Sequence, residues 1–228
     1  MTAALPEGEE KVRAVRSMFD AIAPRYDLVN RVLTFRMDVG WRRRTVESLR
    51  LPSRSLVVDL AAGTGDLCRE LESRGHVPIG IDLSWGMLAH ARTSAPLVQA
   101  DALRLPLPGG AVAGATCGFA LRNLVDLTGF FGELARVVRA GGRVALLEVA
   151  QPRHRVLHWG HGIYFDKLVP RIGALLSDGA AYRYLPRSVA YLPPQGALLD
   201  SLAAAGFAEV DRRLLSGGIA QLITGTRK

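Results

Sequence analysis

The chain has 228 residues, of which 49% are hydrophobic, 22% charged and 7% aromatic. This composition is typical of a folded globular domain and excludes a mainly disordered chain. Only two cysteines, Cys68 and Cys117, are present, and they lie in no CxxC or histidine-rich context, so we expect neither a disulfide framework nor a metal site.

The formal net charge is +8, and it is unevenly distributed. Residues 55–150 are nearly neutral, whereas the positive excess lies in residues 1–54 and 151–228. Such an excess can attract nucleic acid or an anionic lipid surface, or it can reflect arginines on solvated helices. No apolar run approaches the roughly 18 to 20 residues of a membrane-spanning helix, and no secretory signal pattern is visible. We therefore expect a cytoplasmic protein.

Residues 1–54 predict a helical cap. Apolar residues recur at helical spacing in residues 9–23, and Pro24 ends this predicted helix. A second amphipathic helix is predicted from about Asp38 to Leu49, with three consecutive arginines inside it.

Residues 55–150 alternate between strand and helix patterns. The predicted strands are 55–62, 77–82, 97–101, 112–120 and 143–150, and the predicted helices between them are 66–74, 84–93 and 126–139. This alternation is typical of a doubly wound, mostly parallel sheet, with strands that are buried on both faces.

The alternation stops after Pro152. Residues 151–193 are predicted to form a helical insert that is basic and rich in aromatic residues. Residues 194–228 predict one helix followed by two strands, which we expect to pair as an antiparallel hairpin at the edge of the sheet. The predicted fold is thus a single α/β domain, residues 1–228, with a doubly wound seven-stranded mostly parallel sheet.

Ligands of such a sheet bind beyond the carboxyl ends of its strands. The first predicted strand carries Asp59 and is followed by a turn with Gly63, Thr64 and Gly65. Glycines allow the main chain to turn sharply and to approach a ligand closely, and the helix that follows offers unpaired amides. We therefore expect these four residues to contribute to a cofactor site.

Acidic residues also follow the next two predicted strands. Asp82 ends the second strand, where a carboxylate can accept hydrogen bonds from both hydroxyls of a ribose. Asp101 and Ala102 follow the third strand, where a carboxylate and a main-chain amide can bind an adenine. Three such features in succession predict a ligand that contains adenosine.

The glycine turn helps to choose the cofactor. A dinucleotide fingerprint reads GxGxxG, but here Gly63 and Gly65 are followed by Cys68, and no phosphate-binding lysine follows. A loop with two glycines suits a cofactor without a diphosphate, and S-adenosylmethionine is such a cofactor.

Several segments resemble known families. VVDLAAGTGDL, IDLSWGML and ADALRLPLP are similar to the class I S-adenosylmethionine-dependent methyltransferases. MFDAIAPRYDLVNRVLTFRMDVGWRRR, FALRNLVDL, LVPRIGALLSDGAAYRYLPRSV and LLSGGIAQL resemble the ubiquinone/menaquinone biosynthesis C-methyltransferases, from about residue 16 to the C-terminus.

The resemblance implies methylation of a ring carbon of a prenylated quinol such as demethylmenaquinol. It also implies cofactor contacts by Thr64, Asp82, Asp101 and Ala102. Gly118 stands where the family often has serine, and this departure leaves another phenolic or polyketide small molecule as an alternative substrate.

Methylation at carbon requires an electron-rich ring, so the site must favour a phenolate. We expect Arg122 to supply a fixed cation beside the ring oxygen and Asn123 to orient Arg122 or the substrate, although Arg122 could instead form a salt bridge. Tyr26 is expected to close over the methionine end of the cofactor. His154, His158 and His161 are candidate bases, or surface residues of a basic helix.

The partners follow from the same features. The basic, aromatic stretch 153–177 could contact an anionic membrane surface peripherally, or pack on the sheet. A nucleic-acid substrate is not expected, because the sequence FALR replaces the Asn/Asp-Pro-Pro-aromatic motif of many base-modifying enzymes. A cofactor-binding protein without catalytic activity and a homodimer are further alternatives that the sequence leaves open.

Overall fold

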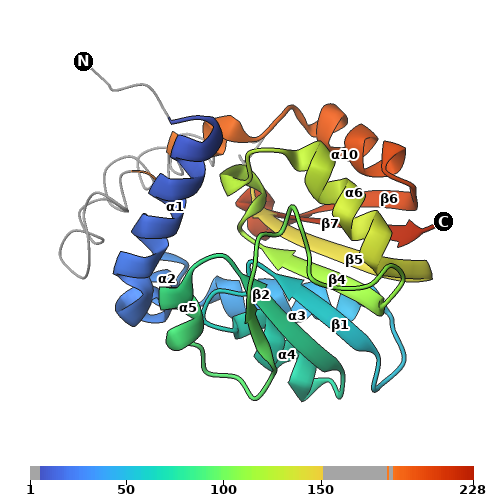
Figure 1. The fold of residues 1–228 in the computed structure, drawn as a ribbon, viewed down its shortest axis with the longest axis horizontal. Helices are drawn as coiled ribbons and strands as arrows, with labels where there is room; N and C mark the ends of the chain where they lie inside the picture. The colour runs from blue at the N-terminus through green and yellow to red at the C-terminus, as the bar shows by residue number, and fades with distance from the viewer. Residues whose placement is uncertain (1–5, 151–183, 185–186) are drawn as a thin grey trace.

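The computed structural model describes residues 6–150, Tyr184 and residues 187–228 of the chain (Figure 1). These residues form a seven-stranded sheet with the order β3-β2-β1-β4-β5-β7-β6. The strands are β1 (Leu56–Leu60), β2 (Val77–Asp82), β3 (Leu97–Gln99), β4 (Val112–Gly118), β5 (Val138–Val149), β6 (Phe207–Leu215) and β7 (Ala220–Arg227). The predicted α/β class with a doubly wound, mostly parallel sheet is confirmed.

The pairing of the strands explains the shape of the sheet. Strands β1 to β5 run parallel to one another, and β1 lies between β2 and β4. Strand β7 is antiparallel to both β5 and β6, so the two C-terminal strands form the expected hairpin at the edge. The carboxyl ends of the parallel strands all face α1 (Gly8–Ile22), on the left of Figure 1.

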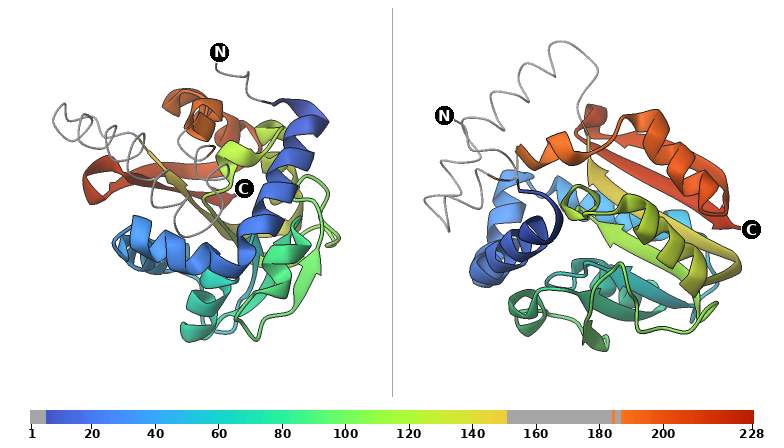
Figure 2. Two further views of the ribbon diagram at one scale, coloured as in Figure 1. Left: turned by 90° about the vertical axis from the view of Figure 1, so that its left-hand side faces the viewer. Right: turned by 45° about the horizontal axis from the view of Figure 1, so that its top comes forward.

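One core layer lies between the sheet and two helices, α6 (Leu127–Val137) and α10 (Gln195–Ala204) (Figure 2). Phe130 and Phe131 of α6 are fully buried there, against strand residues that include Val58. Aromatic side chains bury a large apolar area, so this layer contributes strongly to stability.

The opposite face of the sheet is covered by α3 (Met37–Leu49) and α4 (Asp66–Ser73). Trp41 of α3 and Leu71 of α4 are buried there beside Val57 of β1. Val57 and Val58 thus point into different layers, as the two-residue period of a strand requires.

The N-terminal segment contains one helix more than the sequence predicts. After α1 and a short turn of helix (Ala23–Arg25), α2 (Tyr26–Leu33) precedes α3. The sequence-based predictions place no helix over residues 26–33, although Val29 and Leu33 are buried at helical spacing. A helix of only eight residues is marginal on its own in water, so packing stabilises it.

Three predicted boundaries differ from the structure by two to five residues. Helix α5 (Trp85–Ala89) ends earlier than the predicted 84–93, because the Arg92 amide instead donates to the Thr64 carbonyl oxygen at 3.0 Å. Strand β3 ends at Gln99 rather than at Asp101, and β5 starts at Val138 rather than at residue 143.

Most of the predicted insert, residues 151–193, lies outside the described residues, and so do its three candidate histidines. A short turn of helix, Val189–Tyr191, is described near its end. Within the described part of the chain, none of the helices combines the length and apolar character that crossing a membrane requires.

We predict opposite effects of the same substitution at two glycines. A Cβ at Gly142 would lie 2.7 Å from the Ala113 carbonyl oxygen and 2.8 Å from that of Arg139, so Gly142→Ala should destabilise the fold by about 1–3 kcal/mol. A Cβ at Gly132, inside α6, would meet nothing within 4 Å, so Gly132→Ala should stabilise it by about 0.5–1 kcal/mol. Urea unfolding measures both, and equal effects would contradict this account.

Candidate active site at the carboxyl edge of the sheet

A cavity opens where the parallel strands end. Its wall is formed by the segments that follow β1, β2, β3 and β4, and by one face of α1. Among the residues that the sequence nominated, it is lined by Tyr26, Gly63, Asp82, Asp101, Ala102 and Asn123. Six of the ten nominated residues are therefore brought together around one cavity.

The turn after β1 has a strained backbone. Ala61 has φ +52°, Gly63 has φ +57° and Gly65 has φ +82°, in the region that favours glycine. A Cβ at Gly63 would meet nothing within 4 Å, whereas a Cβ at Gly65 would lie 2.9 Å from Cγ2 of Thr93. Gly63 therefore faces open space at the cavity, while Gly65 allows the segment after α5 to pack against the turn.

Asp82 is the polar centre of the cavity wall. Its Oδ2 accepts a hydrogen bond from the Gly63 amide at 2.8 Å, and its Oδ1 accepts one from the Ser84 amide at 2.8 Å. Burial raises the pKa of this carboxyl, although both amides act in the opposite direction. A partly buried carboxylate stabilised only by main-chain amides is well suited to accept hydrogen bonds from hydroxyl donors.

Asp101 and Ala102 lie farther along the same wall. Asp101 is exposed, and its Oδ1 accepts a hydrogen bond from the Leu103 amide at 2.9 Å. This bond fixes the turn after β3, and both Asp101 and Ala102 line the cavity.

Three nominated residues do not line the cavity but support the turn. Asp59 is buried, and its carboxylate accepts hydrogen bonds from Thr116 at 2.7 Å and from the Cys68 thiol at 3.5 Å. The Thr64 hydroxyl donates to Asp27, and Gly65 is buried at the start of α4. For Asp59, Thr64 and Gly65, the geometry indicates positioning of the turn rather than contact through the side chain.

Helix α1 forms the apolar wall of the cavity. Val12, Val15 and Phe19, which the sequence predicts as its apolar face, line the cavity and are only partly buried. At one end of the helix, the Lys11 ammonium donates to the Leu124 carbonyl oxygen at 2.9 Å. At the other end, Oδ1 of Asp20 accepts a hydrogen bond from the Ser84 hydroxyl at 2.6 Å. Helix α1 is thus fastened on both sides of the cavity.

Comparison with known proteins assigns the family. The model of the ubiE/COQ5 methyltransferase family matches residues 7–227. The chain belongs to this family. The demethylmenaquinone methyltransferase of Thermus thermophilus is 42% identical, over 92% of this chain and 100% of the relative. The demethylmenaquinone methyltransferase of Roseiflexus sp. is 38% identical, over 100% and 99%.

Solved structures share the fold of this methyltransferase. A Thermotoga maritima protein described as a possible histamine N-methyltransferase has a TM-score of 0.67 and 20% identity, and the match covers 93% of this chain and 99% of that one. Phosphoethanolamine N-methyltransferase 2 of Haemonchus contortus, solved with S-adenosyl-L-methionine, has a TM-score of 0.61 and 11% identity, over 82% and 52%.

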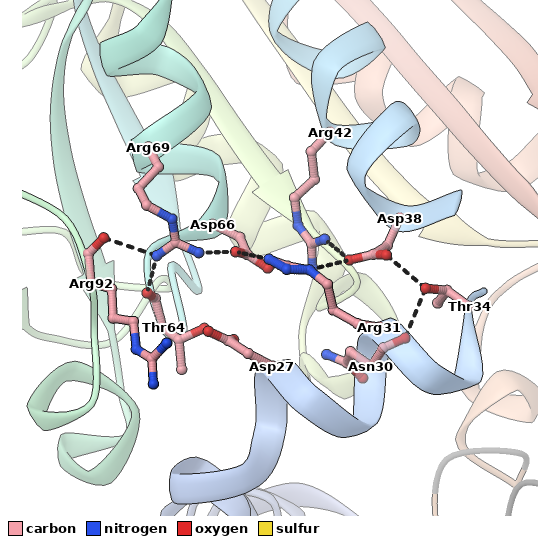
Figure 3. Close-up of polar contacts among 10 residues, drawn as sticks. All are labelled: Asp27, Asn30, Arg31, Thr34, Asp38, Arg42, Thr64, Asp66, Arg69 and Arg92. Atoms are coloured by element: carbon pink, nitrogen blue, oxygen red, sulfur yellow. Dashed lines mark hydrogen bonds and ion pairs between the residues drawn. The ribbon is translucent and has the colours of Figure 1, made fainter. Parts of the chain in front are cut away.

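A cluster of ion pairs holds the N-terminal helices of the methyltransferase against the glycine turn (Figure 3). Asp66, the first residue of α4, pairs with Arg31 of α2 at 2.9 Å, with Arg42 of α3 at 3.0 Å, and with Arg69. Asp38 also pairs with Arg42. Burial opposes ionisation of Asp66, but the three arginines outweigh it and hold the pKa of this carboxyl below its usual value.

Arg122 is placed differently from the expectation. It is buried at 6% exposure, its guanidinium pairs with Glu148 of β5, and its Nε donates to the Ser188 hydroxyl at 3.1 Å. Arg122 does not line the cavity. The expected direct contact with a ring oxygen therefore does not fit this geometry, and the salt-bridge alternative does.

Asn123, in contrast, reaches the cavity. Its Oδ1 accepts a hydrogen bond from the Tyr184 hydroxyl at 3.3 Å, which leaves the amide nitrogen as the donor for a ligand. Arg122 thus anchors a short turn of helix, Leu121–Asn123, whose last side chain faces the cavity.

Two supporting carboxylates were not nominated from the sequence. Glu148 comes from the fifth strand and Asp20 from α1, and each contacts a residue more than 25 positions away. The only feature of the sequence that could have identified Glu148 as a supporting residue is its charge near the end of a predicted strand. No feature of the sequence identifies Asp20 as one.

The burial of Asp59 should make the stability of the fold depend on pH. Burial raises the pKa of this carboxyl to about 7, so between pH 4 and pH 7 the folded protein holds a proton that the unfolded chain releases. This contribution to stability is present below pH 4 and is lost as the pH rises through 7. Asp59→Asn, which imitates the protonated form, should flatten the decline measured by urea unfolding. An unchanged slope would contradict the assignment.

Glu148 should be essential for stability. Glu148→Ala leaves the buried Arg122 guanidinium without its carboxylate, and we expect a loss of about 3–5 kcal/mol in the free energy of unfolding. The matched control is Glu209→Ala, which removes an exposed partner of Arg143 and should cost less than about 1 kcal/mol. Similar losses for both variants would show that the buried pair has no special role.

Proposed function

We propose that this methyltransferase transfers the methyl group of S-adenosylmethionine to a ring carbon of a prenylated quinol, with demethylmenaquinol as the first candidate. The observation that carries the proposal is the cavity itself, which is lined by Asp82 at the end of β2, by Asp101 in the turn after the adjacent strand β3, and by the apolar face of α1. The names of the relatives, which match over nearly the whole chain, support the choice of quinol.

The residues of the wall fit this cofactor. Asp82 would accept hydrogen bonds from the ribose hydroxyls, and Asp101 with the Ala102 amide would bind the adenine. Gly63, where a Cβ would meet only open space, lets a ligand approach the main chain. When bound, the cofactor supplies an electrophilic methyl group on a sulfonium.

Tyr26 and Phe119 extend the site from the cofactor side toward the substrate side. Phe119 has φ +59°, a strained conformation that turns the chain at the end of β4 toward the cavity. Burial raises the pKa of the Tyr26 hydroxyl, so this phenol remains protonated at neutral pH and does not act as a base. Tyr26 would therefore bind and orient ligands.

Asn123 is the polar group that would face the substrate oxygen. An amide donor beside the oxygen stabilises the phenolate that makes the neighbouring ring carbon nucleophilic. Arg122 would act through Asn123, because its own charge is balanced by Glu148. The apolar side chains of α1 would exclude water from the reacting carbon.

Other expectations stay predictions. The candidate proton acceptors His154, His158 and His161 and the basic stretch 153–177 lie outside the described residues. The homodimer is likewise untested.

The test is an incubation with labelled S-adenosylmethionine and chemically reduced demethylmenaquinone, followed by chromatography of the ring-methylated product. We expect transfer to the quinol and not to the oxidised quinone. Asp82→Ala should weaken cofactor binding at least about 100-fold by calorimetry, because a charged acceptor of two hydrogen bonds is lost. Asn123→Ala should keep binding and lower turnover roughly 100-fold.

Asp200→Ala is the matched control, since this exposed carboxylate of α10 is not among the residues of the cavity wall. It should change neither binding nor turnover. Cofactor binding without transfer to any quinol would refute the proposed reaction, and transfer to another phenolic ring would redirect it to that substrate class.

A further inference from the structure

Large apolar side chains are exposed where α2 joins α3. Leu28 is 58% exposed, Val32 41%, Phe35 70% and Val39 42%. They recur every three or four residues through α2, the turn and the first residues of α3, a segment that we call the α2–α3 corner (residues 28–39). A concentration of large apolar side chains on the surface marks a site of interaction.

The backbone of the corner holds these side chains outward. Phe35 and Arg36 are consecutive residues with φ +49° and +61°, which non-glycine residues rarely adopt. The turn is fixed by main-chain bonds from the Arg36 amide to the Arg31 oxygen and from the Met37 amide to the Thr34 oxygen, both 2.9 Å. A strained conformation of this kind persists only where the surrounding contacts impose it.

The exposed charge next to the apolar residues of the corner is positive. Residues 25–44 contain six arginines and two aspartates. Asp27 accepts a hydrogen bond from Thr64, Asp38 pairs with Arg42, and Arg31 and Arg43 pair with Asp66 and Glu47. Arg25, before Leu28, and Arg36, beside Phe35, are exposed.

We propose that the α2–α3 corner docks on the surface of an anionic phospholipid bilayer. Exposed apolar side chains flanked by arginines are the chemistry of an interfacial element, in which apolar groups enter the acyl boundary and cations meet phosphate headgroups. The proposal rests on the proposed function, because a prenylated quinol is dissolved in a bilayer.

Two other partners could cover the corner, a second copy of the chain or residues 151–183 of the same chain, and the charge of the corner disfavours both. A second copy of the chain would bring the same arginines against each other across a two-fold interface. Residues 151–183 of this chain carry five basic and two acidic side chains, so they share the sign of the corner rather than complement it. An anionic bilayer is the partner whose charge is complementary.

The corner also adjoins the cavity. Tyr26, at the start of α2, lines the cavity, and Leu28, the first apolar residue of the corner, is two positions further along the same helix. Docking at the corner would therefore place the bilayer beside the cavity, where the ring of a prenylated substrate could enter while its tail stays in lipid.

The experiment is co-sedimentation of the full chain with vesicles of phosphatidylcholine alone or with about 30% phosphatidylglycerol. We expect binding to the anionic vesicles that weakens with added salt, and little binding to the neutral ones. The double variant Val32→Ser/Phe35→Ser should bind at least tenfold more weakly. The control Val77→Ser changes a valine of 48% exposure at the start of β2, at the other end of the strands, and should bind as the wild type does.

Two further measurements separate the outcomes. Thermal unfolding of each variant establishes that it is folded. The double variant should methylate a short-chain, water-soluble quinol without vesicles as fast as the wild type does. If the wild type itself does not methylate this quinol, the proposed function is refuted, but the docking proposal is not. Equal vesicle binding by all variants, absence of wild-type binding, or a dimer that dissociates in the double variant would each overturn the docking proposal.

Discussion

The geometry of parallel pairing determines where this protein can do chemistry. Because β1, β2, β3 and β4 run in the same direction, the segments that leave them meet at one edge of the sheet, although they are far apart in the sequence. Asp82, Asp101 and Asn123 are gathered there without any direct contact among them. The remaining elements close this edge: α1 supplies an apolar wall, and α2 presses on the glycine turn through Asp27.

Charged groups inside this structure serve to position others. Asp66 is surrounded by three arginines from α2, α3 and α4 (Figure 3), and Glu148 holds Arg122 below the cavity. Buried pairs of this kind add little net stability, since desolvation offsets much of their attraction, but they are costly to break. The effect of these pairs is therefore to specify one arrangement, in which the N-terminal helices pack against the glycine turn after β1. The residues that we propose as ligand contacts are instead those that line the cavity.

The sequence allowed good prediction of the sheet and of the acidic residues that line the cavity. Continuous apolar runs ended by acidic or glycine residues identified the buried strands, and both C-terminal strands were placed as an edge hairpin. Prediction from the sequence failed where a contact between residues far apart in the sequence overrode the local pattern. The Arg92 amide donates to the Thr64 carbonyl oxygen instead of continuing the predicted helix, and α2, with eight residues, depends on packing for its stability. Arg122 was nominated because it follows a strand, but Glu148, on the neighbouring strand, turns it into the interior.

The sequence by itself determined the class of fold and the order of the strands, and it predicted the type of cofactor, because these follow from local periodicity and from residue types at strand ends. Only the tertiary structure decided which of the nominated residues face the cavity. Asp59 is the penultimate residue of β1 and Asp82 is the last residue of β2, yet Asp59 is hydrogen-bonded to Thr116 while Asp82 lines the cavity. The direction of a side chain at a strand end depends on the packing of neighbouring segments, and a single sequence does not specify those long-range contacts.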